Sequence, residues 1–214
     1  MDFLYTVVGF VQAGGVFMYP ILIVFAMGAA VAIERIVVLS SIGNKNRKVW
    51  NQLHPIMSEG NFDEARNITE EDDSHISRLL GMGLARQGAV RRRDDIEIAM
   101  EESMMEIIPQ LEKRTPYVAL FANISTLLGL LGTIMGLIEA FTAVANANPA
   151  DKADLLSASI SVAMNTTAFG LMAAIPLLII HTFITSKTGE IVDSLEMASV
   201  KTLNIISEST KRQG

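Results

Sequence analysis

The chain has 214 residues, half of them hydrophobic, and carries a formal net charge of -6 with no cysteine. A mean hydropathy of +0.37 with 19% charged residues is typical of a membrane protein. The absence of cysteine excludes a disulfide framework, a thiolate metal site and a cysteine nucleophile, and the acidic charge argues against nucleic acid as a partner.

Three windows of the sequence contain no aspartate, glutamate, lysine or arginine. They cover residues 3–33, 117–138 and 155–186. A helix needs roughly 20 residues to cross about 30 Å of hydrocarbon, so each window is long enough for one span. We therefore predict an all-α membrane protein with three transmembrane helices and long cytoplasmic helical extensions.

The first window contains helix-breaking residues near its start. Gly14, Gly15 and Pro20 interrupt it, so residues 1–15 are predicted to form a periplasmic interfacial amphipathic helix and residues 16–41 the first transmembrane helix. The other predicted segments are a cytoplasmic helical region at residues 42–115, a second transmembrane helix at 116–144, a periplasmic loop at 145–154, a third transmembrane helix at 155–185 and a cytoplasmic C-terminal helix at 186–214.

Basic residues beside the predicted spans indicate the orientation, because lysine and arginine gather on the cytoplasmic side of a membrane. They follow the first span, precede the second and follow the third: Lys45, Arg47, Lys48, Lys113, Arg114 and Lys187. The pattern predicts a periplasmic N-terminus and a cytoplasmic C-terminus.

The charged region at residues 42–115 is patterned as helix. Asn61 and Glu64 resemble a capping box, which predicts a helix start. Apolar residues at three- and four-residue steps predict a later helix that is able to run straight into the second span: Ile96, Met100, Met104, Ile107 and Leu111. The acidic run at residues 69–74 and the arginines at 91–93 are interpreted as solvated caps or loops, with lipid-headgroup binding as the alternative for the arginines.

Small and hydroxyl-bearing residues line one face of the second and third predicted spans. Two interpretations are open: close helix packing with hydroxyls bonded to the preceding turn, or an ion path. Hydroxyls at similar depth, at Thr133 on one span and at Thr166 and Thr167 on the other, favour the ion path. Candidate ion-pathway residues are Thr126, Thr133, Asn165, Thr166 and Thr167, and candidate helix-packing residues are Gly129, Gly132, Gly136, Gly170 and Pro176.

Few charged side chains lie near the spans. Glu34 and Arg35, near the inner end of the first span, are interpreted as structural charges that pair with other helices or reach the interface. Glu139, near the outer end of the second span, is either a vestibule charge or an interface anchor. No carboxylate lies in the middle of a predicted span, so an ion-driven machine needs one from a partner. No motif places a nucleophile beside a base, so we predict neither an enzyme nor a bound cofactor or resident metal.

Two motifs resemble the MotA/TolQ/ExbB family of proton-channel proteins. Residues 127–141 read LLGLLGTIMGLIEAF, which is similar to the family's Gly-Leu-Leu-Gly-Thr-Val-x-Gly-Met-Ile-x-x-Phe signature. Residues 159–179 read SISVAMNTTAFGLMAAIPLLI, which is similar to its second signature, with Thr-Ala-x-Gly-Leu-x-x-Ala-Ile-Pro. A weaker likeness covers residues 34–35 and 59–65. The length and the three spans favour the ExbB/TolQ branch over the four-span MotA branch.

The resemblance implies an ion-conducting stator subunit of a motor in the bacterial cytoplasmic (inner) membrane. It implies a homo-oligomer, a pentamer in this family, whose second and third spans enclose two copies of an ExbD/TolR-like single-span partner. That partner carries the ion-binding aspartate, and Thr133 and Thr167 match the family's pore threonines. Ion flow would energise an envelope or outer-membrane transport process, with a TonB/TolA-like protein and membrane lipids as further candidate partners.

Two departures from the family pattern concern the coupling ion. Many relatives have a glutamate where this chain has Val162 and a proline where it has Thr126. The pair Thr166 and Thr167 resembles the threonine doublet of sodium-driven stators, and its oxygens suit a transient bare Na⁺. Proton coupling, sodium coupling and a non-conducting membrane scaffold all stay open as alternatives.

Overall fold

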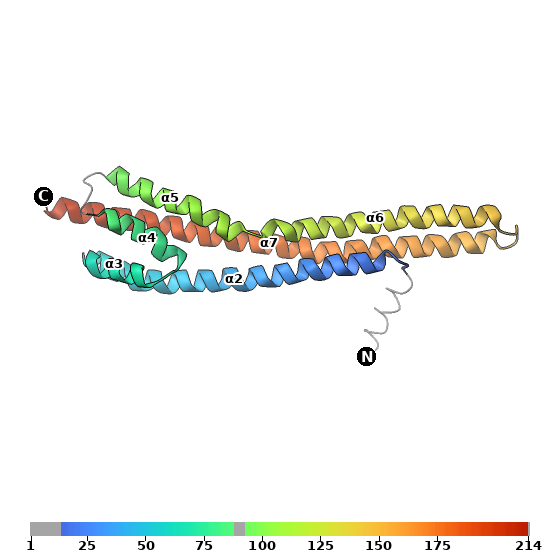
Figure 1. Cartoon of the computed structure of the whole chain (residues 1–214), viewed down its shortest axis with the longest axis horizontal. Helices are drawn as coiled ribbons and strands as arrows, with labels where there is room; N and C mark the ends of the chain where they lie inside the picture. Colours follow the sequence, from blue (N-terminus) through green and yellow to red (C-terminus); the bar gives the residue numbers. More distant parts are fainter. Residues whose placement is uncertain (1–13, 88–92, 214) are drawn as a thin grey trace, which may run out of the picture. The chain divides into compact units, whose positions relative to one another are not determined.

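The computed structural model describes residues 14–87 and 93–213, and it is built from helices joined by short connections (Figure 1). In chain order these are α2 (Met18–Ser58), α3 (Phe62–Glu71), α4 (His75–Arg86), α5 (Arg93–Glu112), α6 (Thr115–Asn146) and α7 (Lys152–Gln213). The predicted all-α fold class is confirmed. The predicted interfacial helix at residues 1–15 lies outside the described residues, except for its last two positions.

Three helical stretches among the described residues are long and apolar enough to cross a membrane. They are Met18–Ser58, Arg93–Asn146 and Lys152–Ser209. The second and third contain a whole charge-free window of the sequence, and the first contains about half of one. The prediction of three membrane-spanning helices with long helical extensions is therefore confirmed by helix length and composition.

Helices α2 and α7 continue well beyond the predicted spans without a break. Helix α2 runs to Ser58 and α7 to Gln213, so the predicted boundaries at residues 41 and 185 are not helix ends. Buried apolar residues at helical spacing lie past both boundaries: Val49, Leu53 and Met57 on α2, and Ile191, Leu195 and Ala198 on α7. A buried face of this kind stabilises a helix whose other faces are polar.

The helix of the cytoplasmic region does not run straight into the second span, a possibility that the sequence had left open. Helix α5 ends at Glu112 and α6 begins at Thr115, with Arg114 in the left-handed region at φ 67°. The physical reason is Pro116, at the start of α6. A proline ring inside a helix clashes with the carbonyl four residues earlier, which here is that of Glu112. The helix therefore stops there and restarts with the proline in its first turn, where proline is tolerated.

The chain divides into two compact units. Unit 1 comprises Met1–Glu34 and Arg114–Phe183, and unit 2 comprises Arg35–Lys113 and Ile184–Gly214.

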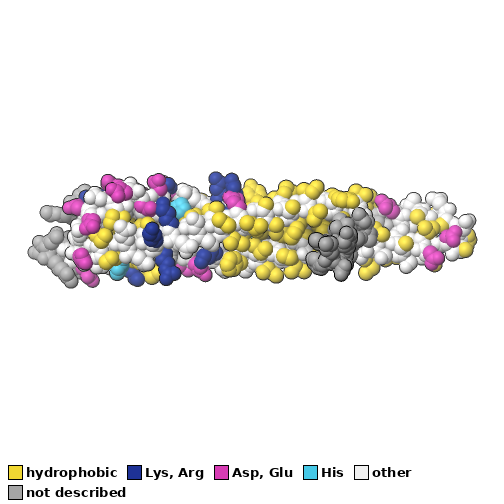
Figure 2. All heavy atoms as spheres, turned by 90° about the horizontal axis from the view of Figure 1, so that it is seen from below, with side chains coloured by type: hydrophobic (Ala, Val, Ile, Leu, Met, Phe, Trp, Pro, Cys, Tyr) yellow, Lys and Arg dark blue, Asp and Glu magenta, His cyan; other side chains and the backbone are white. Residues whose placement is uncertain are grey.

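Unit 1 has an apolar outer surface. Leu127, Phe141, Met164 and Ile179 are all exposed, and hydrophobic side chains cover this part of the molecule in Figure 2. Soluble proteins seldom expose contiguous apolar surface of this kind, whereas hydrocarbon solvates it readily. The interior of unit 1 contains mainly small residues, among them Ala122, Ala140, Ala163 and Ala174.

Unit 2 has a larger apolar core and a charged surface. Its fully buried side chains include Leu53, Met57, Leu79, Leu80, Leu84, Met100, Ile107 and Leu111. Helix α4 packs against both α3 and α5. Charged side chains gather over this unit in Figure 2, as expected for a part of the chain in contact with water.

The local start of α3 is as predicted, but its capping differs. The helix begins at Phe62, directly after Asn61. The Asn61 side chain caps no backbone N–H; its Nδ2 instead donates to Glu64 Oε2 at 2.5 Å. The next helix has a true side-chain cap, because Ser74 Oγ accepts from the backbone N–H of Ser77 at 3.3 Å.

The acidic run at residues 69–74 ends α3 and contains a half-buried ionic cap. Asp72 Oδ2 accepts from the backbone N–H of Ser74 and from Ser77 Oγ, both at 2.8 Å, and Asp72 Oδ1 lies 3.1 Å from Lys45 Nζ on α2. Partial burial alone would raise the pKa of Asp72, but the hydrogen bonds from Ser74 and Ser77 and the Lys45 ammonium together hold it well below its usual range. The prediction of a cap is confirmed, although Asp72 is paired and only partly solvated.

The arginine triplet is described only at its last member. Arg93 begins α5, and its Nη2 donates to Asn204 Oδ1 on α7 at 3.1 Å. The other two arginines lie outside the described residues.

Candidate functional site

Helices α6 and α7 approach each other closely in unit 1 because glycines face each other. A Cβ on Gly170 would lie 2.7 Å from the carbonyl oxygen of Ser125 and 2.9 Å from Gly129 Cα. A Cβ on Gly129 would meet Gly170 Cα at 3.2 Å, and one on Gly136 would meet Ala163 Cβ at 2.8 Å. Only glycine allows this separation, so backbone carbonyls of one helix come within reach of side chains on the other.

A pair of threonine hydroxyls occupies this helix contact. Thr133 on α6 and Thr167 on α7 share a hydrogen bond between their Oγ1 atoms. The Gly129 carbonyl oxygen lies 3.2 Å from Thr133 Oγ1 and 3.0 Å from Thr167 Oγ1, and the Ala163 carbonyl oxygen lies 3.4 Å from Thr133 Oγ1. Both side chains are half-buried. We call these four oxygens, from Thr133, Thr167, Gly129 and Ala163, the hydroxyl pair site.

The hydroxyl pair site is rich in acceptors. A threonine hydroxyl donates one proton and accepts through two lone pairs, and a carbonyl oxygen only accepts. Two protons are therefore shared among four oxygens, and lone pairs remain for a further donor or a cation. The site itself carries no formal charge.

Thr166 lies elsewhere, although it is adjacent to Thr167 in the sequence. It is 2% exposed, and its Oγ1 donates to the carbonyl oxygen of Gly14 at 2.7 Å and contacts that of Val162 at 3.1 Å. Gly132 is the residue that makes room for it, since a Cβ at position 132 would overlap Thr166 Cγ2. The structure therefore separates the predicted doublet into one hydroxyl in the α6–α7 contact and one facing the segment before α2.

The remaining predicted pathway and packing residues do not join the hydroxyl pair site. Thr126 Oγ1 donates to the Ala122 carbonyl oxygen one turn earlier at 3.3 Å. Asn165 is half-buried, whereas Pro176 and Glu139 are exposed. Among the described residues no group of three or more histidine, aspartate or glutamate side chains is arranged to hold a metal ion.

Glu34 and Arg35 each contact the segment around the start of α6. In unit 1, Glu34 Oε1 pairs with Arg114 Nη1 at 2.8 Å. In unit 2, Arg35 is 4% exposed, and its Nη2 donates to the carbonyl oxygen of Leu111 at 2.5 Å. Leu111 lies in the last turn of α5, where carbonyls lack helical partners and a cation is favourable.

Sequence reasoning missed the backbone members of the hydroxyl pair site. The Gly129 and Ala163 carbonyls look like any others in the sequence, and the Gly14 carbonyl lies far from Thr166 along the chain. The signal that points to them is the small-residue stripe itself, because a carbonyl becomes available to a neighbouring helix only where that helix packs against glycine or alanine.

Comparisons with known proteins extend over most of the chain. A family model described as the MotA/TolQ/ExbB proton channel family matches residues 71–197. A putative biopolymer transport protein ExbB homolog of Methanothermobacter thermautotrophicus is 27% identical over 199 residues, which cover 92% of this chain and 69% of that protein. The Tol-Pal system protein TolQ of Haemophilus influenzae is 40% identical over 78 residues, 36% of this chain and 34% of that protein. The biopolymer transport protein exbB1 of Vibrio cholerae is 49% identical over 57 residues, 27% of this chain and 25% of that protein. The family match includes every residue of the hydroxyl pair site.

Proposed function

Because this chain belongs to the MotA/TolQ/ExbB proton channel family and matches its ExbB/TolQ branch, we propose that it is the ion-conducting stator subunit of a motor in the bacterial inner membrane. It is a membrane protein of a family of proton channels, which is not a family of enzymes. We further propose that the subunit uses a proton or sodium gradient to drive a single-span ExbD/TolR-like partner.

The observation that carries this proposal is the hydroxyl pair site. It places neutral, acceptor-rich oxygens in a half-buried position within an otherwise apolar helix pair. A protonated carboxyl group from a partner would donate to a threonine oxygen or to the Gly129 carbonyl. After losing its proton, the carboxylate would need donors, and either threonine hydroxyl could supply one by rotating. The same pair of side chains therefore stabilises both states of a visiting carboxyl group, which lets it load and unload an ion.

The assembly we propose follows the family resemblance. Five copies of this chain would enclose two partner helices, with residues 116–144 and 155–185 lining the pore. Five subunits and two helices have no common symmetry, so the partner engages the subunits unequally and each ion step favours rotation. The N-terminus and the loop at residues 145–154 would be periplasmic. Work would pass to an envelope or outer-membrane transport process through a TonB/TolA-like protein.

The hydroxyl pair site favours the proton over sodium as the coupling ion. A bare Na⁺ at Thr166 and Thr167 is the alternative, because hydroxyl and carbonyl oxygens suit a hard cation. The Thr166 hydroxyl, however, already donates to the Gly14 carbonyl and lies away from the pair. Thr126, Asn165 and Glu139 belong to the proposal as further parts of the pathway and its vestibule.

A non-conducting membrane scaffold is the second candidate function. It is favoured by the close glycine contacts and by hydroxyls bonded to the preceding turn, as at Thr126 and Thr142. On this alternative the threonines contribute only to packing.

Substitution of the hydroxyl pair separates the two functions. We would reconstitute the chain with its single-span partner and measure ion uptake into vesicles under an imposed gradient. Thr133→Ala and Thr167→Ala should each lower the uptake rate about tenfold or more, since a hydrogen bond to a charged group contributes about 1.5–3 kcal/mol. The matched controls are Thr142→Ala on α6 and Thr182→Ala on α7, whose hydroxyls each donate to a carbonyl oxygen one turn earlier in the same helix.

The outcomes distinguish the alternatives. An assembled wild-type complex that takes up no ions would support the non-conducting scaffold. Uptake that survives in both pair variants, in complexes that still assemble, would refute the role of the hydroxyl pair site. Uptake that stops when sodium is withdrawn would assign sodium, and uptake that a protonophore abolishes in sodium-free buffer would assign protons.

A further inference from the structure

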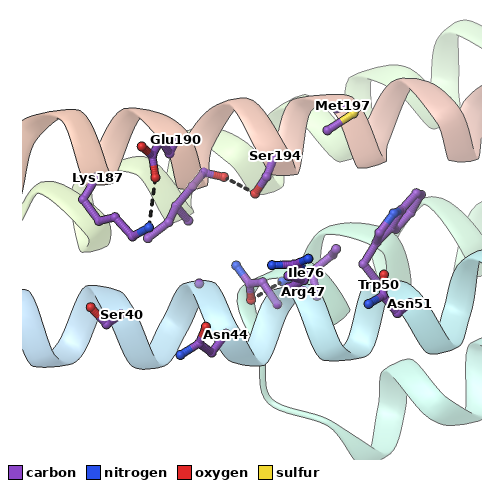
Figure 3. Close-up of a pocket in the computed structure, with 13 residues that line it drawn as sticks. Ser40, Asn44, Arg47, Trp50, Asn51, Ile76, Lys187, Glu190, Ser194 and Met197 are labelled. Atoms are coloured by element: carbon purple, nitrogen blue, oxygen red, sulfur yellow. Dashed lines mark hydrogen bonds and ion pairs between the residues drawn. The ribbon is translucent and has the colours of Figure 1, made fainter.

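A pocket of about 490 Å³ lies in unit 2, whereas the hydroxyl pair site belongs to unit 1. Figure 3 shows that side chains of α2, including Arg47 and Trp50, face side chains of α7, including Lys187 and Glu190. Ile76, at the start of α4, closes a third side. The volume is large enough for a small ligand.

The pocket carries one positive charge that no carboxylate neutralises. Lys187 Nζ pairs with Glu190 Oε2 at 2.9 Å, so these two charges offset each other. Arg47 forms no ion pair in the described part of the chain. A guanidinium group in this setting presents a planar set of donors that matches the oxygens of a phosphate or carboxylate.

A buried amide donor without a partner also lines the pocket. Asn46 is 3% exposed, and its Oδ1 accepts from the backbone N–H of Ile76 at 3.4 Å. That contact fixes the orientation of the Asn46 side-chain amide, so that Oδ1 faces Ile76 and Nδ2 is the donor left for another group. Asn46 Nδ2 is buried and has no hydrogen-bond partner among the described residues. A buried donor left without an acceptor is unfavourable, so an acceptor atom on a ligand would stabilise it.

We propose that this pocket binds a phosphate group, held by the Arg47 guanidinium and the Asn46 Nδ2 donor. Tetrahedral phosphate offers several acceptor oxygens in different directions, so it can satisfy an arginine fork and a separate amide together. Asn44, Asn51 and Ser40 supply additional polar groups on the same wall.

Two sources share this chemistry. The proposed spans end at residues 41 and 185, so Ser40 and Lys187 lie where a lipid headgroup would be. A soluble phosphate compound would reach the same pocket from the cytoplasmic side.

Trp50 provides a direct readout of binding. It is the one tryptophan in the sequence, and it lines the pocket. In the first arm, inorganic phosphate is titrated into the full chain in detergent against chloride at equal ionic strength. In the second arm, the chain is placed in nanodiscs with an increasing share of phosphatidylglycerol in phosphatidylcholine. Trp50 fluorescence is recorded in both arms, and neither arm requires ion conduction.

Three variants test the named residues. Arg47→Gln removes the exposed cation, and Asn46→Asp keeps the oxygen facing Ile76 while replacing the donor with a negative charge. Each should weaken binding about tenfold or more, since a hydrogen bond to a charged group contributes that much. Lys48→Gln is the matched control, because it removes one exposed positive charge next to Arg47 and does not line the pocket.

A saturable fluorescence change in the first arm identifies a soluble phosphate ligand, and one confined to the phosphatidylglycerol series identifies a lipid headgroup. Either result supports the proposal when Arg47→Gln and Asn46→Asp weaken it and Lys48→Gln does not. A response absent from both arms, or equal in all three variants, overturns it. Circular dichroism of Asn46→Asp checks that the helices remain folded.

Discussion

Gly170→Ala should destabilise unit 1 through a single added methyl group. The new Cβ would lie 2.7 Å from the Ser125 carbonyl oxygen and 2.9 Å from Gly129 Cα, whereas carbon contacts are normally about 3.5–4.0 Å. Both neighbours are backbone atoms of α6, so no side-chain rotation relieves the clash and the helices must separate. Overpacking of this kind costs about 3 kcal/mol at the upper end of its usual range. The better helix propensity of alanine offsets about 1 kcal/mol. The expected net loss is therefore about 2 kcal/mol.

Gly189→Ala on the same helix is the matched control. A Cβ at position 189 would meet no atom within 4 Å, so alanine should stabilise the chain by about 1 kcal/mol through helix propensity alone. The assay is unfolding in mixed micelles by increasing sodium dodecyl sulfate, followed by circular dichroism. Equal stabilisation by both substitutions would refute the close approach of α6 and α7.

Three further predictions concern side-chain pairs. The double variant Thr133→Cys with Thr167→Cys should form an intramolecular disulfide on mild oxidation, because the native hydroxyls are in hydrogen-bond contact. The single variants should not form one, because the chain has no other cysteine. A gel-mobility shift reports the disulfide. Asp72→Asn should lower the free energy of unfolding by about 1–2 kcal/mol at pH 7. Folding lowers the Asp72 pKa from its ordinary 3.8. The excess of the wild-type free energy of unfolding over that of Asp72→Asn is therefore complete above about pH 4 and should disappear as the pH falls further. Denaturant titrations at several pH values would detect this loss. Arg114→Ala should be less stable than wild type, since it keeps a φ of 67° and loses the ion pair with Glu34. Arg114→Gly should lie within about 1 kcal/mol of wild type, because relief of left-handed strain offsets an exposed pair; a glycine variant no more stable than the alanine variant would contradict this.

The existence of the spanning helices follows from the sequence because long apolar windows have few alternatives to helix in hydrocarbon. The ends of these helices do not follow from the sequence. Hydropathy indicates where a helix would leave the hydrocarbon of the membrane, and not where the helix itself ends. Helix α2 continues to Ser58 because Leu53 and Met57 bury an apolar face in unit 2. The break before α6 coincides with Pro116, whose ring would clash with the Glu112 carbonyl. The sequence does not single it out, because Pro55, Pro109 and Pro176 lie inside unbroken helices.

The candidate site could be predicted only in part. Glycine and threonine spacing pointed to a polar helix face, and Thr133 and Thr167 do meet across α6 and α7. The separate position of Thr166 depends on its contact with Gly14, which lies more than a hundred residues away in the sequence. Local periodicity carries no information about such a long-range contact. Consecutive residues of a helix point about 100° apart, so Thr166 and Thr167 face different directions, but the sequence alone does not show which of them meets α6.

The electrical neutrality of the hydroxyl pair site has a physiological consequence. A permanent carboxylate there would attract cations at all times, and the cell would face dissipation of its gradient whenever the subunit was made in excess. Hydroxyl and carbonyl oxygens attract ions only weakly without a formal charge beside them. On the proposed function, surplus copies of the chain would therefore be electrically silent, and the cell could synthesise the two kinds of subunit in unequal amounts without harm to its energy supply.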